Sequence, residues 1–186
     1  MALDDVMLEV EGNMESAVEY LRQEFRGIRT GRASAGLVDH LKVQYYGSPT
    51  DLRQLASIST PESNLIVIKP FDPNSLKDIE RAIQTSELGI NPNSDGKVIR
   101  LVIPPLSGER RQQLAGQLRK MSEAARVTIR NARRDGNKAV DALEKDGELS
   151  EDEAEKARED VQGLTKQYEG KVDELLAAKT KEIQET

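Results

Sequence analysis

The chain has 186 residues but no cysteine, a single histidine and only 3% aromatic residues. The absence of cysteine excludes disulfide bonds and thiolate chemistry. No apolar run approaches the roughly 20 residues that a membrane-spanning helix needs. The amino-terminal residues also lack the basic start and apolar stretch of a secretory signal peptide, so we expect a cytoplasmic protein.

Patterns for catalysis or ligand binding are scarce as well. His40 has no cysteine or second histidine with which to form a metal or nucleophilic site, so it is interpreted as a surface or turn residue. No glycine-rich loop ends in the Lys-Ser or Lys-Thr pair of a phosphate-binding loop. The segment Asn91–Gly96 lacks the spaced oxygen ligands of a calcium loop and is interpreted as a turn. The sequence therefore predicts no catalytic site, no metal site and no cofactor.

Charge is abundant but unevenly distributed. Charged residues make up 32% of the chain, and the formal net charge is −6. Residues 110–138 hold nine basic and two acidic side chains, whereas residues 141–186 hold fifteen acidic and seven basic ones. A polyanion would be attracted to the first segment and repelled by the second.

Three segments carry apolar residues at the spacings of three and four that mark one face of a helix. They are residues 3–28, 114–143 and 154–183. Ser107 is a plausible N-cap of the second helix, and Ser150 with Glu153 forms a capping box before the third. Long helices with a single apolar stripe must pack on one another, so the pattern predicts a three-helix bundle.

The segment between the first two helices has a different period. Strands are expected at 41–45, around 52–58, at 65–68 and at 98–103, with one helix that opens after Asp72-Pro73-Asn74-Ser75 and stops near Leu88-Gly89. We therefore predict an α+β domain of residues 31–105, inserted into a bundle domain of residues 1–30 and 106–186. The linkers predict a hinge, because glycine loosens one and two prolines stiffen the other. The hinge residues are Thr30, Gly31, Pro104 and Pro105.

The second long helix carries an arginine stripe. Arg126, Arg130 and Arg133 follow one another at spacings of four and three, and Arg119 lies seven residues before Arg126. Arginine suits bidentate contacts with phosphate. With so few aromatics, stacking along a single strand is disfavoured, and phosphate recognition of folded RNA remains. The alternative, which spacing alone leaves open, is that these arginines pair with the acidic third helix.

Several motifs follow one another in the order of a known family. They are Arg29-Thr30-Gly31-Arg32-Ala33-Ser34, Tyr45-Tyr46-Gly47, Leu52-Arg53-Gln54-Leu55-Ala56, Leu88-Gly89-Ile90-Asn91-Pro92, Pro104-Pro105-Leu106, Glu109-Arg110-Arg111, Ala125-Arg126-Val127 and Ile129-Arg130-Asn131-Ala132-Arg133-Arg134-Asp135. Together they make the chain resemble the bacterial ribosome recycling factors over essentially its whole length.

The resemblance implies an L-shaped, monomeric molecule with a three-helix bundle and a mobile β/α/β domain. It implies a non-enzymatic protein that binds the large ribosomal subunit and its 23S rRNA. With elongation factor G and GTP, it would split the post-termination ribosome and release it from mRNA. By motif match, Arg130 and Arg133 are RNA-contacting residues. The same surface is expected to include Arg126, Arg119, Arg134, Arg110, Arg111, Arg29 and Arg32.

Departures from the family and two rival functions accompany this resemblance, and among the departures is the pair Ala35-Gly36 in place of a more apolar or proline-containing pair. Gly108 replaces a usual acidic residue and Gly136 a usual alanine, and glycine inside a helix costs about 1 kcal/mol relative to alanine. A coiled-coil adaptor or chaperone cofactor would need an exposed apolar groove. A small enzyme in the inserted domain would need a polar cluster in a pocket.

Overall fold

A computed structural model describes residues 2–185 of the chain. The described chain divides into two compact units. The first comprises residues 2–25 and 112–181, and the second comprises residues 26–111 and 182–185. The domain limits predicted at residues 31 and 105 both lie inside the second unit.

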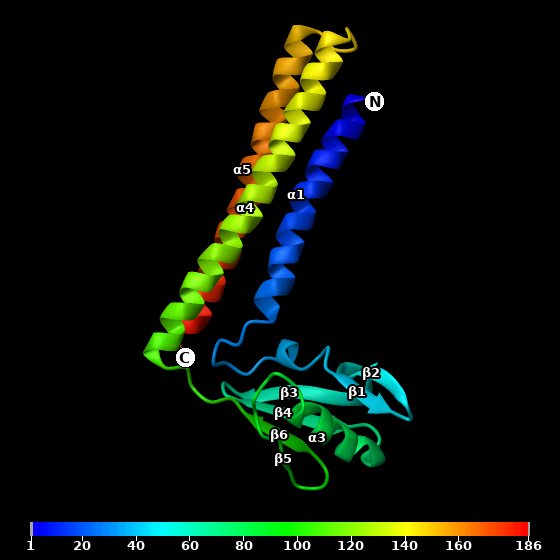
Figure 1. The fold of residues 1–186 in the computed structure, drawn as a ribbon, viewed down its shortest axis with the longest axis vertical. Coiled ribbons are helices and arrows are strands. Elements are labelled where there is room, and N and C mark those ends of the chain that lie inside the picture. The colour runs from blue at the N-terminus through cyan, green and yellow to red at the C-terminus, as the bar shows by residue number, and fades with distance from the viewer. Residues whose placement is uncertain (1, 186) are drawn as a thin grey trace. The chain divides into compact units, whose positions relative to one another are not determined.

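Three long helices build the first unit, and they match the three predicted apolar stripes (Figure 1). They are α1 (Leu3–Arg26), α4 (Gly108–Lys145) and α5 (Glu151–Gln184). Their inward faces are almost fully buried, with Met14 and Leu21 on α1, Ile129 on α4, and Val161 and Val172 on α5. The bundle is thus held by the apolar stripes, because each helix alone would leave its stripe in water.

Polar side chains cap the amino-terminal ends of α4 and α5, as the sequence predicts. The Ser107 hydroxyl accepts a hydrogen bond from the backbone N–H of Arg110 at 3.2 Å. At the start of α5, the Ser150 backbone N–H donates to Glu153 Oε2 at 2.9 Å, and the Glu153 N–H donates to the Ser150 hydroxyl at 3.4 Å. The pKa of Glu153 is lowered first of all by the hydrogen bond from the Ser150 backbone N–H and then by one that the Ser150 hydroxyl donates to Glu153 Oε2 at 2.7 Å. The capping box therefore fixes where α5 begins.

Gly136 marks a close approach between α1 and α4. It is buried within α4, and a Cβ atom placed on it would overlap Val10 Cγ2 of α1. Val10 is itself only 3% exposed and branched at Cβ, so it has little freedom to move aside. The glycine that weakens α4 by its helix propensity is therefore the residue that lets the two helices meet.

The second unit is a small α+β domain built on two antiparallel sheets. A four-stranded sheet has the order β3-β4-β6-β5, and a separate hairpin joins β1 to β2 (Figure 1). The strands are β1 (Lys42–Tyr45), β2 (Ser48–Asp51), β3 (Ala56–Glu62), β4 (Leu65–Pro70), β5 (Asn93–Ser94) and β6 (Ile99–Val102). The helices are α2 (Leu52–Leu55) and α3 (Leu76–Gln84), with 3-10 turns η1 (Ala35–Leu37) and η2 (Pro73–Ser75). Ile79 and Ile83 of α3 are fully buried in one cluster with Ile66 and Ile68 of β4.

The hairpin corrects the prediction for residues 46–58. Tyr46 and Gly47 both have positive φ angles, 48° and 79°, which is the conformation of a two-residue type I′ turn. Tyr45 consequently pairs with Ser48, and residues 48–51 form a strand that the sequence analysis does not predict. The strand expected around residues 52–58 begins only at Ala56, because residues 52–55 form one helical turn.

Two further limits differ from the prediction. The helix α3 of the second unit ends at Gln84 rather than near Leu88-Gly89. The hydroxyls of Thr85 and Ser86 donate to the carbonyls of Arg81 and Ile83, at 3.0 and 2.6 Å, where the helix ends. Asn93 and Ser94, expected in a turn, form the short edge strand β5.

Asp95 organises the turn that follows β5. Its carboxylate accepts hydrogen bonds from the backbone N–H groups of Lys97 and Val98, both at 2.9 Å, and from Arg100 at 3.0 Å. These bonds, that of Val98 foremost, lower the pKa of Asp95 from 3.8 to about 2. The turn is therefore stabilised by the ionised carboxylate.

Acid should weaken this turn in a defined window. A carboxyl group whose pKa is depressed by folding stabilises the fold above its unfolded pKa, and this stabilisation is lost as the pH falls through the folded pKa. We expect Asp95→Asn to destabilise the second unit at pH 7 and to flatten its pH dependence between about 4 and about 2. The rate of hydrogen exchange at the Val98 amide, compared between the wild type and Asp95→Asn across this pH range, measures both changes. Glu87→Gln, at an exposed carboxylate of the same unit, should leave the pH dependence unchanged.

Candidate nucleic-acid interface

Four arginines lie along one side of α4, and we call this set the arginine face: Arg119, Arg126, Arg130 and Arg133. The neighbouring side of the helix holds Ala125, Ile129 and Ala132, which are buried in the bundle. Packing of that apolar side fixes the rotation of α4. The arginines are consequently held at the surface of a rigid element rather than on a loop.

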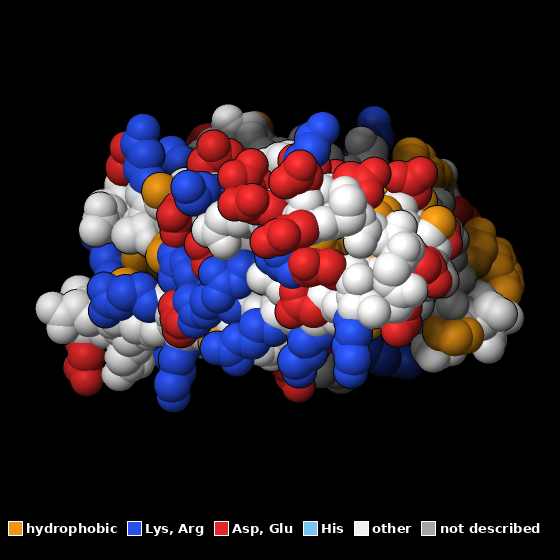
Figure 2. All heavy atoms as spheres, turned by 90° about the horizontal axis from the view of Figure 1, so that it is seen from above, with side chains coloured by type: hydrophobic (Ala, Val, Ile, Leu, Met, Phe, Trp, Pro, Cys, Tyr) orange, Lys and Arg blue, Asp and Glu red, His pale blue; other side chains and the backbone are white. Residues whose placement is uncertain are grey.

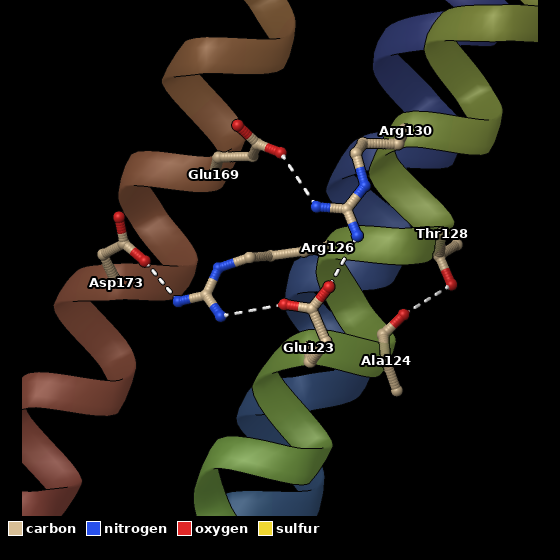
Figure 3. A network of polar contacts seen from close by, with 7 residues as sticks. All are labelled: Glu123, Ala124, Arg126, Thr128, Arg130, Glu169 and Asp173. Atoms are coloured by element: carbon tan, nitrogen blue, oxygen red, sulfur yellow. Dashed lines mark hydrogen bonds and ion pairs between the residues drawn. The ribbon is translucent and has the colours of Figure 1, made fainter.

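Arg126 is bound between two helices. Its Nη2 atom lies 2.5 Å from Asp173 Oδ1 on α5, and its Nη1 atom lies 3.4 Å from Glu123 Oε2 on α4 (Figure 3). The hydrogen bond to Asp173 is the main cause that raises the pKa of Arg126. Its side chain is only 22% exposed, and both terminal nitrogens of its guanidinium group already pair with carboxylates.

Arg130 also faces carboxylates, although less closely. Its Nη2 atom lies 2.6 Å from Glu123 Oε1, and its Nη1 atom lies 4.0 Å from Glu169 Oε1 (Figure 3). The hydrogen bond from Arg130 is the main cause that lowers the pKa of Glu123. Glu123 therefore bridges Arg126 and Arg130, two neighbouring cations of the face.

The remaining arginines of this region, Arg119, Arg133 and Arg134, do not pair with a carboxylate among the described residues. Among the described residues, Arg133 donates only to the neutral amide oxygen of Gln162, at 3.4 Å. Arg119 and the neighbouring Arg134 are exposed, and within residues 2–185 they have no hydrogen-bond or ion-pair partner. Among the arginines of this part of the chain, Arg119, Arg133 and Arg134 thus carry positive charge without a carboxylate partner in residues 2–185.

The other predicted RNA-binding arginines belong to the second unit. Arg110 and Arg111 lie in the first turn of α4. Arg29 is half-buried and donates to the Leu88 carbonyl at 3.2 Å, whereas Arg32 is exposed. The structure therefore groups the four arginines of the arginine face, and it assigns these four to a separate unit.

The predicted hinge residues also belong to the second unit. Thr30 and Gly31 are buried, and Pro104 and Pro105 are exposed. Gly31 has a φ of +78°, and a Cβ atom placed there would lie 3.2 Å from Leu106 Cγ. This conformation and this contact both favour glycine at position 31.

The sequence analysis does not name the three carboxylates that pair with Arg126 and Arg130, which are Glu123, Glu169 and Asp173. The spacings of three and seven from Glu123 to Arg126 and Arg130 are the signal that could have identified the first. The pairing with α5 follows the alternative in which arginines meet the acidic third helix. Charge remains segregated nevertheless: in the view of Figure 2, Lys and Arg side chains gather in a band beside a larger group of Asp and Glu side chains.

Other candidate sites are sparse in the described chain. Residues 2–185 contain no group of three or more metal-ligating side chains, and none of their helices is long and apolar enough to cross a membrane. His40 is exposed in a turn. A groove of about 440 Å³ runs between α1 and α4, with Leu21, Met121 and Ala125 among its lining residues. It is the feature that an adaptor protein would use.

Comparison with known proteins identifies the family. The family described as "Ribosome recycling factor" matches residues 21–183. A ribosome-recycling factor of Synechococcus sp. is 51% identical over 177 residues, which are 95% of this chain and 97% of that protein. The ribosome-recycling factor of Nitratidesulfovibrio vulgaris is 51% identical over 183 residues, which are 98% of each chain.

Solved structures agree with the sequence relatives. A solution structure of a ribosome recycling factor has a TM-score of 0.83 and 44% identity, and the match covers 99% of this chain and 98% of that one. A second has a TM-score of 0.71 and 39% identity, and covers 98% and 99%. This second structure is that of the T. thermophilus ribosome recycling factor, which is bound with E. coli elongation factor G to the E. coli post-termination complex. The chain therefore belongs to the ribosome recycling factor family, a family of translation factors rather than enzymes.

Proposed function

We propose that this chain binds the large ribosomal subunit through the arginine face of α4, with the phosphates of 23S rRNA as its ligand. Together with elongation factor G and GTP, it splits the post-termination ribosome into subunits and releases it from mRNA. It acts as a monomer in the cytoplasm. The likeness to a recycling factor bound to the post-termination complex supports the reaction, and the arginine face supports the mode of binding.

The main observation behind the RNA contact is the uncompensated charge on α4. Arg119, Arg133 and Arg134 carry no ionic partner within the described residues. From Arg119 to Arg134 the helix extends roughly 22 Å at 1.5 Å per residue, so one rigid element can reach several phosphates. Folded RNA presents such phosphates at fixed positions, which a rigid row of guanidinium groups can match.

The arginines of this face have different roles in the proposal. Arg126 joins α4 to α5 and contributes chiefly to the integrity of the bundle. Arg119 and Arg133 are the primary phosphate ligands of the face, because neither pairs with a carboxylate within residues 2–185. Arg130 contributes once a phosphate replaces its carboxylate partners.

The second unit supplies the moving part in this proposal. Gly31, with its positive φ, and the Pro104-Pro105 pair form the hinge on which the unit swings when elongation factor G pushes it. Glycine permits the backbone conformation at one linker, and the two prolines limit rotation at the other. The bundle then transmits this force to its contacts on the large subunit.

A ribosome-splitting assay tests the proposal. Post-termination ribosomes are mixed with the chain, elongation factor G and GTP, and the loss of light scattering reports separation of the subunits. We expect splitting only when all three components are present, and none when GTP is replaced by a non-hydrolysable analogue. Intact ribosomes in the complete mixture, or equal splitting without the chain, would refute the proposed function.

A further inference from the structure

Glu123 occupies an unusual place within the arginine face. Its side chain is 54% exposed, and its two carboxylate oxygens lie 3.4 Å from Arg126 and 2.6 Å from Arg130 (Figure 3). It is a carboxylate in the middle of a surface that is otherwise suited to bind phosphate. Its contacts with the two guanidinium groups are those that a phosphate oxygen would make.

Glu123 is the closest carboxylate to Arg130 in the described chain. Glu169, the other carboxylate near this guanidinium, lies 4.0 Å away and belongs to α5. Because Glu123 and Arg130 share α4, the carboxylate stays beside the guanidinium wherever α4 docks. Phosphate can approach Arg130 only by displacing this carboxylate or by lying next to it, and either costs affinity.

The exchange is feasible because the pair is open to water. The Arg130 side chain is 35% exposed, and exposed ion pairs of this kind contribute little to stability. A single phosphate that replaces Glu123 exchanges one ion pair for another and gains little. An RNA surface that also engages Arg133, Arg119 and Arg134 gains contacts for which residues 2–185 offer no competing carboxylate.

We propose that Glu123 competes with RNA phosphate for Arg130 and thereby lowers the affinity of the arginine face for RNA in general. This inference rests on the proposed function, because it assumes that the arginine face binds RNA. Its consequence is that a surface with several correctly placed phosphates binds, whereas sparse or irregular phosphates are held weakly. The chain is thus kept from bulk RNA.

Glu123→Gln tests this competition, because glutamine keeps the size of the side chain and removes its charge. Binding to purified large subunits and to poly(U) is measured at constant salt. We expect both affinities to rise by about threefold to tenfold, as expected for the loss of one nearby charge at the surface. Glu174→Gln, the matched control on α5, makes the same change in net charge at an exposed carboxylate without an ionic partner among the described residues, and it should bind like the wild type.

A double-mutant cycle locates the competition at Arg130. We expect Glu123→Gln to lose most of its gain in an Arg130→Ala background. Equal affinities of Glu123→Gln and Glu174→Gln, weaker binding by Glu123→Gln, or a full gain without Arg130 would each overturn the inference. If Arg130→Ala and Arg133→Ala leave the affinity for large subunits unchanged, the proposed RNA contact fails instead, so the two failures are distinguishable.

Discussion

Gly136→Ala is expected to destabilise the bundle, although alanine is the better helix former. Helix propensity alone would stabilise α4 by about 1 kcal/mol. The added methyl group, however, overlaps Val10 Cγ2 in a buried contact between α1 and α4. Overpacking of a core typically costs about 1–3 kcal/mol. After the gain in helix propensity is subtracted, we expect a net loss of up to about 2 kcal/mol in the free energy of unfolding, measured by chemical denaturation.

Gly116→Ala is the matched control for this prediction. Gly116 lies in the same helix, and a Cβ atom placed there meets nothing within 4 Å. This variant should therefore be stabilised, by up to about 1 kcal/mol. The double variant Val10→Ala/Gly136→Ala should lose less free energy of unfolding than the two single variants lose in sum, because the smaller side chain at position 10 removes the overlap. A Gly136→Ala protein as stable as Gly116→Ala would contradict the close approach of the two helices.

The second large effect is expected from Arg130→Ala/Arg133→Ala. A hydrogen bond to a charged group contributes about 1.5 kcal/mol or more, and Arg130 gives up its contact with Glu123 when it binds phosphate. The loss of both arginines should therefore weaken binding to large subunits by roughly tenfold to a hundredfold. Both side chains lie at the surface, and their partners Glu123 and Gln162 are exposed, so the fold should survive. Equilibrium binding to purified large subunits measures the loss.

A second pair of basic residues controls for net charge. Lys156→Ala/Lys166→Ala removes the same charge from exposed positions on α5. Its affinity should stay within a fewfold of the wild type. An equal loss in both double variants would mean that general charge, rather than the arginine face, governs binding.

The bundle could be predicted from the sequence because each long helix repeats its signal over many turns. Ser107 and Ser150 mark the starts of α4 and α5 by the same hydrogen bonds that the sequence indicates. The hairpin at Tyr46 could not be predicted in this way. A tyrosine with positive φ has no favourable local signal, and the conformation is imposed by the pairing of β1 with β2.

The arginine face shows a similar limit. Spacing places Arg126 and Arg130 on one side of α4, but it does not say which carboxylates of α5 lie opposite them. Asp173 and Glu169 reach these arginines only because the bundle sets α5 beside α4. Gly136 is the clearest case, because its local cost and its packing role have opposite signs, and only the position of Val10 shows the second.

The salt dependence of large-subunit binding, compared between the wild type and Arg133→Ala, tests the central claim most directly. Phosphate contacts release counter-ions, so the logarithm of the wild-type affinity should fall steeply and linearly with the logarithm of salt concentration. Loss of the Arg133 contact should weaken binding at every salt concentration and reduce this slope by about one. A wild-type affinity that is insensitive to salt, or an Arg133→Ala variant with an unchanged slope and affinity, would contradict docking through the arginine face.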